Sequence, residues 1–174
     1  MDDAGQSALF DAFLFLVIAL VASGAVLAYT YLSLAEDEGA ARAESLAYAE
    51  DVRVALLRTT LEDPWYLNGT GERVTLARGV NIERFLLDEV QLLARGLAQE
   101  NFADTNALIL ARARSLVRAP YAVGIGGYLR GEERAADLWL GDGSAPPPER
   151  STASWSYGTL EGSTVTLEVD LWRT

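Results

Sequence analysis

The hydrophobic and polar positions divide the chain into an uncharged N-terminal stretch, a helical middle and a strand-like end. Residues 12–35 contain no charged side chain. At about 1.5 Å per residue, a helix of that length spans roughly 36 Å, which exceeds the roughly 30 Å hydrocarbon core of a bilayer. We therefore predict a hydrophobic helix, within residues 1–35, that is long enough to cross a membrane.

The helical pattern continues beyond residue 35 but becomes amphipathic. After the polar residues 36–39, apolar side chains recur at three and four residues along one face. They are Leu46, Ala49, Val52, Leu56 and Leu57, followed by Thr60. Pro64 ends the pattern, because proline disfavours helical geometry at and before its own position. We predict one helix of about 55 residues, with residues 36–63 as its amphipathic part.

Two shorter helices are predicted within residues 81–118. Asn81 is a favourable N-cap, and the apolar positions that follow it have helical spacing. Those positions are Ile82, Phe85, Leu86, Val90, Leu93 and Leu97. The next helix begins at Asp104 or Thr105, directs Leu108, Ile109, Leu116 and Val117 inward, and ends before Pro120. We expect these two helices to form a hairpin against the amphipathic part of the first.

After Pro120 the hydrophobic period changes from helical to alternating. Residues 164–171 alternate Thr, Glu or Asp with Val or Leu, and residues 158–162 are suited to a hairpin turn before them. The glycines at 124, 126 and 127 indicate a strand that is either bulged or closely approached by another part of the chain. We predict an antiparallel sheet of three or four strands in residues 121–173. The predicted fold class is therefore α+β, with residues 36–174 as the head domain.

The composition excludes several classes of chemistry. The chain has no Cys and no His, so it offers neither a thiol nucleophile nor the commonest general base and zinc ligand. All 14 basic residues fall at or after Arg42, and the net charge is −11, which argues against binding to nucleic acid. The acidic groups at 36–38 and at Asp137 and Asp142 lack the spacing of a calcium loop. We predict a protein without catalytic residues, cofactor or metal.

The N-terminus differs from an ordinary secretory signal. Such signals have a basic first segment and an apolar core of about 7 to 15 residues. Here residues 1–5 are acidic rather than basic, and the apolar run is longer. A permanently retained helix is therefore the better interpretation.

Gly5, Gln6 and Ser7, followed by Asp11 and the long apolar run, resemble the N-terminus of archaeal type IV pilin-like proteins, which carry a class III signal peptide. The resemblance implies that a prepilin peptidase cuts between Gly5 and Gln6. It also implies that Asp11, sixth in the mature chain, pairs with the N-terminal amine of a neighbouring copy. Unlike the family, this leader contains no Lys or Arg, and the acid lies one place later.

The same resemblance implies a lollipop-shaped subunit of an extracellular filament at the cell surface. The chain would enter the membrane first and then polymerise with itself through residues 12–35, with the help of a pilus assembly machinery. The intersubunit residues expected besides Asp11 are Phe13, Leu14, Phe15, Leu16, Val17, Ile18 and Leu20. Two alternatives remain open: a monomeric single-pass surface protein, and a minor pilin that primes or tips a filament.

Asn68, Gly69 and Thr70 match the acceptor sequence for N-linked glycosylation. The segment that contains them is rich in turn-forming residues and lies in the predicted extracellular head. We therefore predict Asn68 as a glycosylation site.

Overall fold

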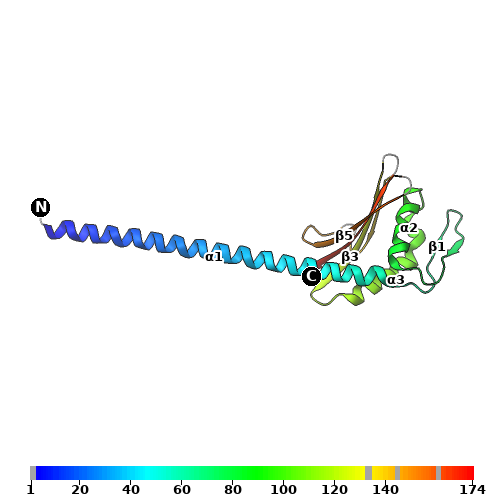
Figure 1. Cartoon of the computed structure of the whole chain (residues 1–174), viewed down its shortest axis with the longest axis horizontal. Helices are drawn as coiled ribbons and strands as arrows, with labels where there is room; N and C mark the ends of the chain where they lie inside the picture. Colours follow the sequence, from blue (N-terminus) through cyan, green and yellow to red (C-terminus); the bar gives the residue numbers. More distant parts are fainter. Residues whose placement is uncertain (1–2, 132–134, 144–145, 160–161) are drawn as a thin grey trace. The chain divides into compact units, whose positions relative to one another are not determined.

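The computed structural model describes the backbone of residues 3–131, 135–143, 146–159 and 162–174, without the side chains of residues 3–12 and 35–38. The chain divides into two compact units, Met1–Ala43 and Glu44–Thr174. Three α-helices, a short 3₁₀ helix and six strands make up the described part, so the predicted α+β class is confirmed. Figure 1 shows the long helix α1 followed by the shorter elements.

Helix α1 spans Asp3–Arg58 as one element of 56 residues. Its length agrees with the prediction, but it ends at Arg58 rather than at residue 63. Beyond Arg58 the backbone turns to pair with the segment before α2: Leu61 N–H donates to the Val80 carbonyl at 2.8 Å, and Thr60 forms a bridge with Asn81. Since Leu61 is also buried in the core, pairing and packing end the helix before Pro64 does.

The head unit contains a four-stranded antiparallel sheet in the order β4-β3-β6-β5. Its strands are β3 Tyr121–Arg130, β4 Ala135–Leu140, β5 Ser151–Gly158 and β6 Thr164–Arg173. Strands β5 and β6 form the predicted hairpin, with Gly158 opposite Thr164. Strands β3 and β6 are central in this sheet, and β4 and β5 are its edges. Two further strands, β1 Trp65–Leu67 and β2 Arg73–Thr75, pair with each other in a separate two-stranded sheet.

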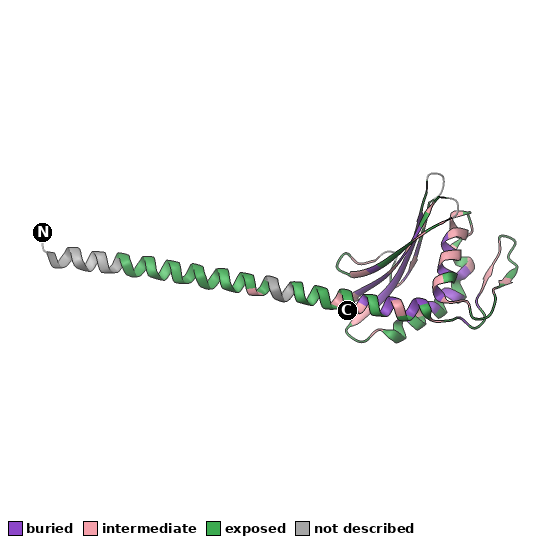
Figure 2. Ribbon diagram, viewed as in Figure 1, coloured by how far each residue is buried: buried purple, intermediate pink, exposed green. Residues whose placement is uncertain are grey.

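Helix α1 contributes one side of its last three turns to the core of the head unit. Ala49, Val52, Leu56 and Leu57 are buried as predicted, whereas Leu46 is 51% exposed. The apolar stripe of the sequence therefore begins one turn earlier than the buried stripe of the structure. Figure 2 shows the buried residues concentrated in the sheet, in α2 and in the end of α1.

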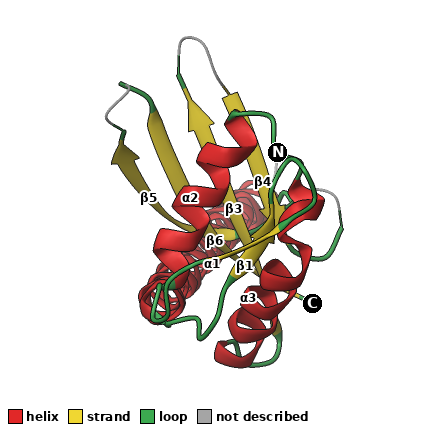
Figure 3. Cartoon of the chain, turned by 90° about the vertical axis from the view of Figure 1, so that its right-hand side faces the viewer, coloured by secondary structure: helices red, strands yellow, loops and turns green. Residues whose placement is uncertain are grey.

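Helix α2 spans Ile82–Ala94, and the Asn81 side chain caps it by accepting from Arg84 N–H at 2.9 Å, as predicted. The helix packs on β3, β4 and β6, so its main partner is the sheet rather than α1. Figure 3 shows α2 crossing one face of the sheet. The predicted hairpin on α1 is therefore replaced by a layer of helix on sheet.

Helix α3, Ala103–Leu116, follows the 3₁₀ helix η1, Gln99–Phe102. It buries Thr105, Asn106, Ile109 and Ala113. Leu108 and Leu116, which we expected to point inward, are 46% and 38% exposed. The polar Thr105 and Asn106 lie on the buried side because both form hydrogen bonds there, a possibility that a hydrophobic pattern does not register.

Gly124 and Gly127 of β3 lie where other side chains approach the strand closely. A Cβ added at Gly124 would be 2.2 Å from the Trp139 ring, and one at Gly127 would be 2.8 Å from Val90 Cγ2. Pairing of β3 with β6 is regular from Tyr121 to Arg130, without a bulge. The close approach predicted for this strand is therefore confirmed, and α2 can lie near the sheet only because Gly127 has no side chain.

Candidate functional site

The first half of α1 exposes large apolar side chains around its whole circumference. The predicted intersubunit residues Phe13, Leu14, Phe15, Leu16, Val17, Ile18 and Leu20 are all exposed, and so are Val21, Val26, Leu27, Tyr29, Tyr31, Leu32 and Leu34. The exposed fraction reaches 76% at Tyr31. A helix that is apolar all round is typical of a membrane span or of a segment buried among other helices.

This segment has the length and hydropathy of a membrane span. The most apolar 18-residue window of the helix from Phe13 to Arg58 has a mean hydropathy of 2.3, and none of it is buried within the chain. Thr30 donates its hydroxyl to the Val26 carbonyl at 2.9 Å, so this polar side chain is satisfied inside the helix. The segment is therefore compatible with anchoring in a membrane.

Small residues in the middle of the segment leave part of its surface close to the backbone. Ala19, Ala22, Ser23, Gly24 and Ala25 are all exposed, and a Cβ added at Gly24 would meet nothing within 4 Å. Small side chains allow another helix to approach closely in an apolar environment. The surface around Gly24 is suited to such an approach.

The predicted processing and pairing residues lie outside the described side chains. The backbone at Gly5, Gln6 and Asp11 is helical, but their side chains are not among those the structure describes. Cleavage between Gly5 and Gln6 and the ion pair of Asp11 therefore stay predictions.

Polar and aromatic contacts connect the last part of α1 to β5 and α2 within the head unit. The guanidinium of Arg53 lies 4.4 Å from the centroid of the Trp155 ring and forms an ion pair with Glu50. Glu50 raises the pKa of Arg53 by accepting its hydrogen bonds, and Arg53 lowers the pKa of Glu50 in the same way. The Trp155 ring in turn stacks on Tyr157, whose hydroxyl bonds to Glu83 of α2. The almost fully buried Arg53 guanidinium therefore contacts both a carboxylate and an aromatic ring.

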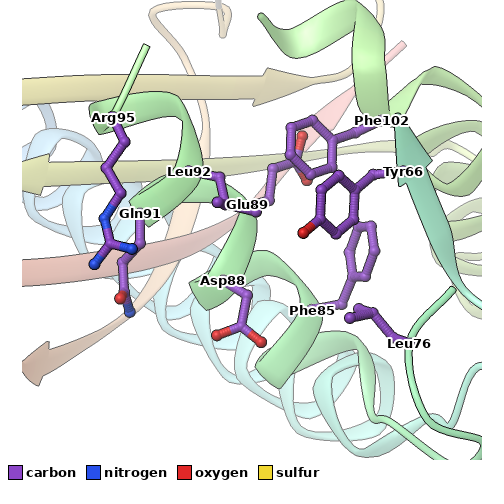
Figure 4. Close-up of a pocket in the computed structure, with 9 residues that line it drawn as sticks. All are labelled: Tyr66, Leu76, Phe85, Asp88, Glu89, Gln91, Leu92, Arg95 and Phe102. Carbon is purple, nitrogen blue, oxygen red and sulfur yellow. The ribbon is translucent and has the colours of Figure 1, made fainter. Parts of the chain in front are cut away.

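A cavity of about 170 Å³ lies beside α2 in the head unit. Tyr66, Leu76, Phe85, Asp88, Glu89, Gln91, Leu92, Arg95 and Phe102 line it (Figure 4). Glu89 is fully buried, and burial raises its pKa to about 8 despite a hydrogen bond from Asn106. Glu89 was not predicted as a site residue, although a lone acid within the apolar stripe of α2 was a visible signal.

The face of the sheet opposite the helices has its own polar cluster. Asp170 is buried there, and its Oδ1 accepts from Arg150 Nε at 2.9 Å and from the Thr152 hydroxyl at 2.5 Å. Burial and the neighbouring Glu168 carboxylate raise the pKa of Tyr128 well above its usual range. The hydrogen bond between Arg150 and Asp170 ties the end of the loop between β4 and β5 to β6.

Asn68 forms the hydrogen bonds of a tight turn. Its Oδ1 accepts from Thr70 N–H at 3.0 Å, from the Thr70 hydroxyl at 2.7 Å and from Glu72 N–H at 2.9 Å. The half-buried Asn68 lies beside the exposed Gly69 and Thr70. Glycosylation at Asn68 stays a prediction.

The acidic residues considered as cation ligands have other roles where the structure describes them. Asp137 pairs with Arg130 at 2.6 Å and Asp142 with Arg114 at 2.5 Å, while residues 36–38 lie outside the described side chains. Within the described residues, no group of three His, Cys, Asp or Glu side chains could hold a metal ion.

Comparison with models of protein families, with curated proteins and with solved structures finds no match to this chain.

Proposed function

We propose that this chain is the structural subunit of an extracellular type IV pilus-like filament. One observation carries the proposal: the first half of α1 exposes apolar side chains on every side and has none of its most apolar window buried within the chain. Water is a poor environment for such a surface, so lipid or copies of the same helix must cover it. A filament subunit uses both in turn, first in the membrane and then in the filament core.

The energetics differ between the two environments. Burying a side chain such as Phe15 or Leu20 contributes about 1.5 to 3 kcal/mol relative to water. Moving the same side chain from lipid to a helix bundle gains much less, because lipid tails are as apolar as leucine. Assembly from the membrane therefore depends on close packing, for which the surface around Gly24 is suited, and on polar contacts between copies.

Asp11 supplies the polar contact in this proposal. A carboxylate within an apolar bundle is costly unless a cation compensates it. Cleavage after Gly5 would create such a cation, the amine of Gln6, at the same end of each subunit. The pairing would fix the axial register of neighbouring helices, and the chain would need no catalytic residue or cofactor for this role.

The test compares Asp11→Ala with Asp3→Ala in the cells that make the protein. Both changes remove one acid near the N-terminus, but Asp3 precedes the proposed cleavage site and would be lost with the leader. We expect Asp11→Ala to abolish filaments in sheared surface material viewed by negative-stain microscopy, while the chain remains in the membrane fraction. Asp3→Ala should assemble like the wild type.

Mass spectrometry of the N-terminus separates the proposal from its alternatives. Filaments composed mainly of this chain and beginning at Gln6 support it. An intact Met1 in chains that remain monomeric in the membrane would instead identify a single-pass surface protein. A processed chain that is only a trace component of filaments would identify a minor pilin, and normal filaments from Asp11→Ala would disprove the role of Asp11.

A further inference from the structure

Glu89 and Asn106 form a buried pair between α2 and α3. Asn106 Nδ2 donates to Glu89 Oε1 at 2.7 Å, with Glu89 0% and Asn106 6% exposed. The other two polar atoms of the pair, Glu89 Oε2 and Asn106 Oδ1, are buried and have no hydrogen-bond partner among the described residues. Both atoms are acceptors while Glu89 is ionised, so neither can satisfy the other in that state.

A proton on Glu89 changes this pattern. A carboxylic acid and a primary amide have complementary groups, because the amide N–H can donate to the carbonyl oxygen of the acid and the acid O–H to the amide oxygen. These two hydrogen bonds together would close a ring between the two side chains. The bond from Asn106 Nδ2 to Glu89 Oε1 is the first half of that ring. Glu89 Oε2 and Asn106 Oδ1 are the two atoms that the second half requires, and buried polar groups are rarely left without partners.

The surroundings favour the neutral acid. The charged or titratable groups that line the same cavity are Tyr66 of β1 and Asp88 and Arg95 of α2. The neighbouring η1 contributes the apolar ring of Phe102 to the same cavity. Burial raises the pKa of Glu89 to about 8, against the lowering effect of the Asn106 hydrogen bond. Figure 4 shows the Glu89 side chain extending beside the Phe102 ring.

We infer that Glu89 is a neutral carboxylic acid in the folded chain, and that its ring with Asn106 is a proton-operated latch between α2 and α3. The latch also affects β1, because Thr105, next to Asn106, accepts from Trp65 N–H and donates to the Trp65 carbonyl. Tyr66 stacks on Phe102 in the same region, with ring centroids 5.2 Å apart. This inference does not depend on the proposed filament.

The latch makes the stability of the head depend on pH in a defined direction. The folded chain binds the Glu89 proton more tightly than the unfolded chain, so the contribution is complete below the ordinary glutamate pKa of 4.5. It decreases as the pH rises and is lost above about pH 8. Across this window the group raises the equilibrium constant for unfolding roughly tenfold per pH unit.

The direct test is a titration of the full chain in detergent micelles, with ¹³C-labelled glutamate side chains followed by NMR. The spectrum of Glu89→Gln identifies the Glu89 resonance by difference. We expect this resonance to change near pH 8, and titration in the ordinary acidic range would overturn the inference. If Glu89→Gln does not fold, the wild-type titration still decides, because Glu89 is the one glutamate buried among the described residues.

Two variants test the latch itself. Glu89→Gln replaces the acid and amide with two amides that can form the same ring, so it should keep α3 protected from hydrogen exchange at pH 8.5 and lose the pH dependence. Asn106→Ala removes the ring and should expose α3 and β1 to exchange at every pH. The exposed Glu100→Gln should behave like the wild type, and an unchanged pH dependence in Glu89→Gln would disprove the latch.

Discussion

At the scale of single residues, the glycines of β3 show how tightly the head is packed. Gly127 faces α2, and an added Cβ would approach Val90 Cγ2 to 2.8 Å and Leu167 Cδ2 to 3.2 Å. Gly126 faces the other side of the sheet, where the nearest atom to an added Cβ is Glu168 Cβ at 3.7 Å. Of these two adjacent glycines, Gly127 therefore lies where an added methyl group would collide with its neighbours, whereas Gly126 has room for one.

Gly127→Ala should destabilise the head, because the new methyl group would force α2 away from the sheet. Overpacking of a closely packed core typically costs about 1 to 3 kcal/mol. Gly126→Ala is the matched control and should cause no such loss, because its added Cβ would make only ordinary van der Waals contacts. Urea denaturation of the full chain in micelles, followed by tryptophan fluorescence, measures both.

The double variant Gly127→Ala with Val90→Ala tests whether contact with Val90 causes the loss of stability. Shortening Val90 removes the atom that the new methyl group would meet, so the double variant should be more stable than the sum of the two single changes predicts. Additive effects would mean that contact with Val90 is not what requires glycine at 127.

The limits of prediction from sequence are also clearest at particular residues. The apolar stripe of α2 and the Asn81 cap follow from local spacing and local hydrogen bonds, and both were predictable. Asn106 is buried because it reaches Glu89, which lies 17 residues earlier in the sequence. Such a contact depends on how two helices meet, so the pair could not be identified from sequence, and only Glu89, an acid within the apolar stripe of α2, gave a local signal.

At the scale of elements, the apolar stripe in the second half of α1 is buried in the head over only part of its length. From Ala49 onward one face is buried in the head, whereas Leu46, at the same spacing, is half exposed. Sequence spacing gives the direction of an apolar face but not the residue at which its partner surface begins. The end of α1 at Arg58 has the same origin, since it is set by pairing with residues near 80.

Leu56→Ala and Leu46→Ala compare a buried position of this stripe with an exposed one. Leu56 is fully buried, and its truncation should cost about 2 to 5 kcal/mol through lost apolar contact and the cavity left behind. Leu46→Ala should change stability by about 0.5 kcal/mol or less, because that side chain already contacts solvent. Denaturant midpoints for the two variants measure the difference. Equal losses would show that Leu46 is covered in the native protein.

At the scale of the whole molecule, the apolar and acidic parts of the chain act in opposite directions on assembly. Residues 12–35 would favour association in the proposed filament, whereas the excess of acidic over basic residues would make neighbouring subunits repel one another. This repulsion is screened by salt, since the Debye length decreases from about 10 Å at 0.1 M to about 3 Å at 1 M ionic strength. In the proposed filament, salt concentration therefore shifts the balance between assembled and free subunits.

We expect purified filaments to shorten and release subunits as sodium chloride is lowered from about 1 M to 0.05 M, where the Debye length exceeds 10 Å. Sedimentation measures the assembled fraction. Sodium chloride also strengthens apolar association, so a variant must separate the two effects. Glu44→Gln, Asp51→Asn and Glu62→Gln together remove three exposed charges from the head and leave residues 12–35 unchanged. If repulsion between heads governs the salt response, this variant should stay assembled at lower salt than the wild type. An identical response would assign the salt effect to the apolar helices instead.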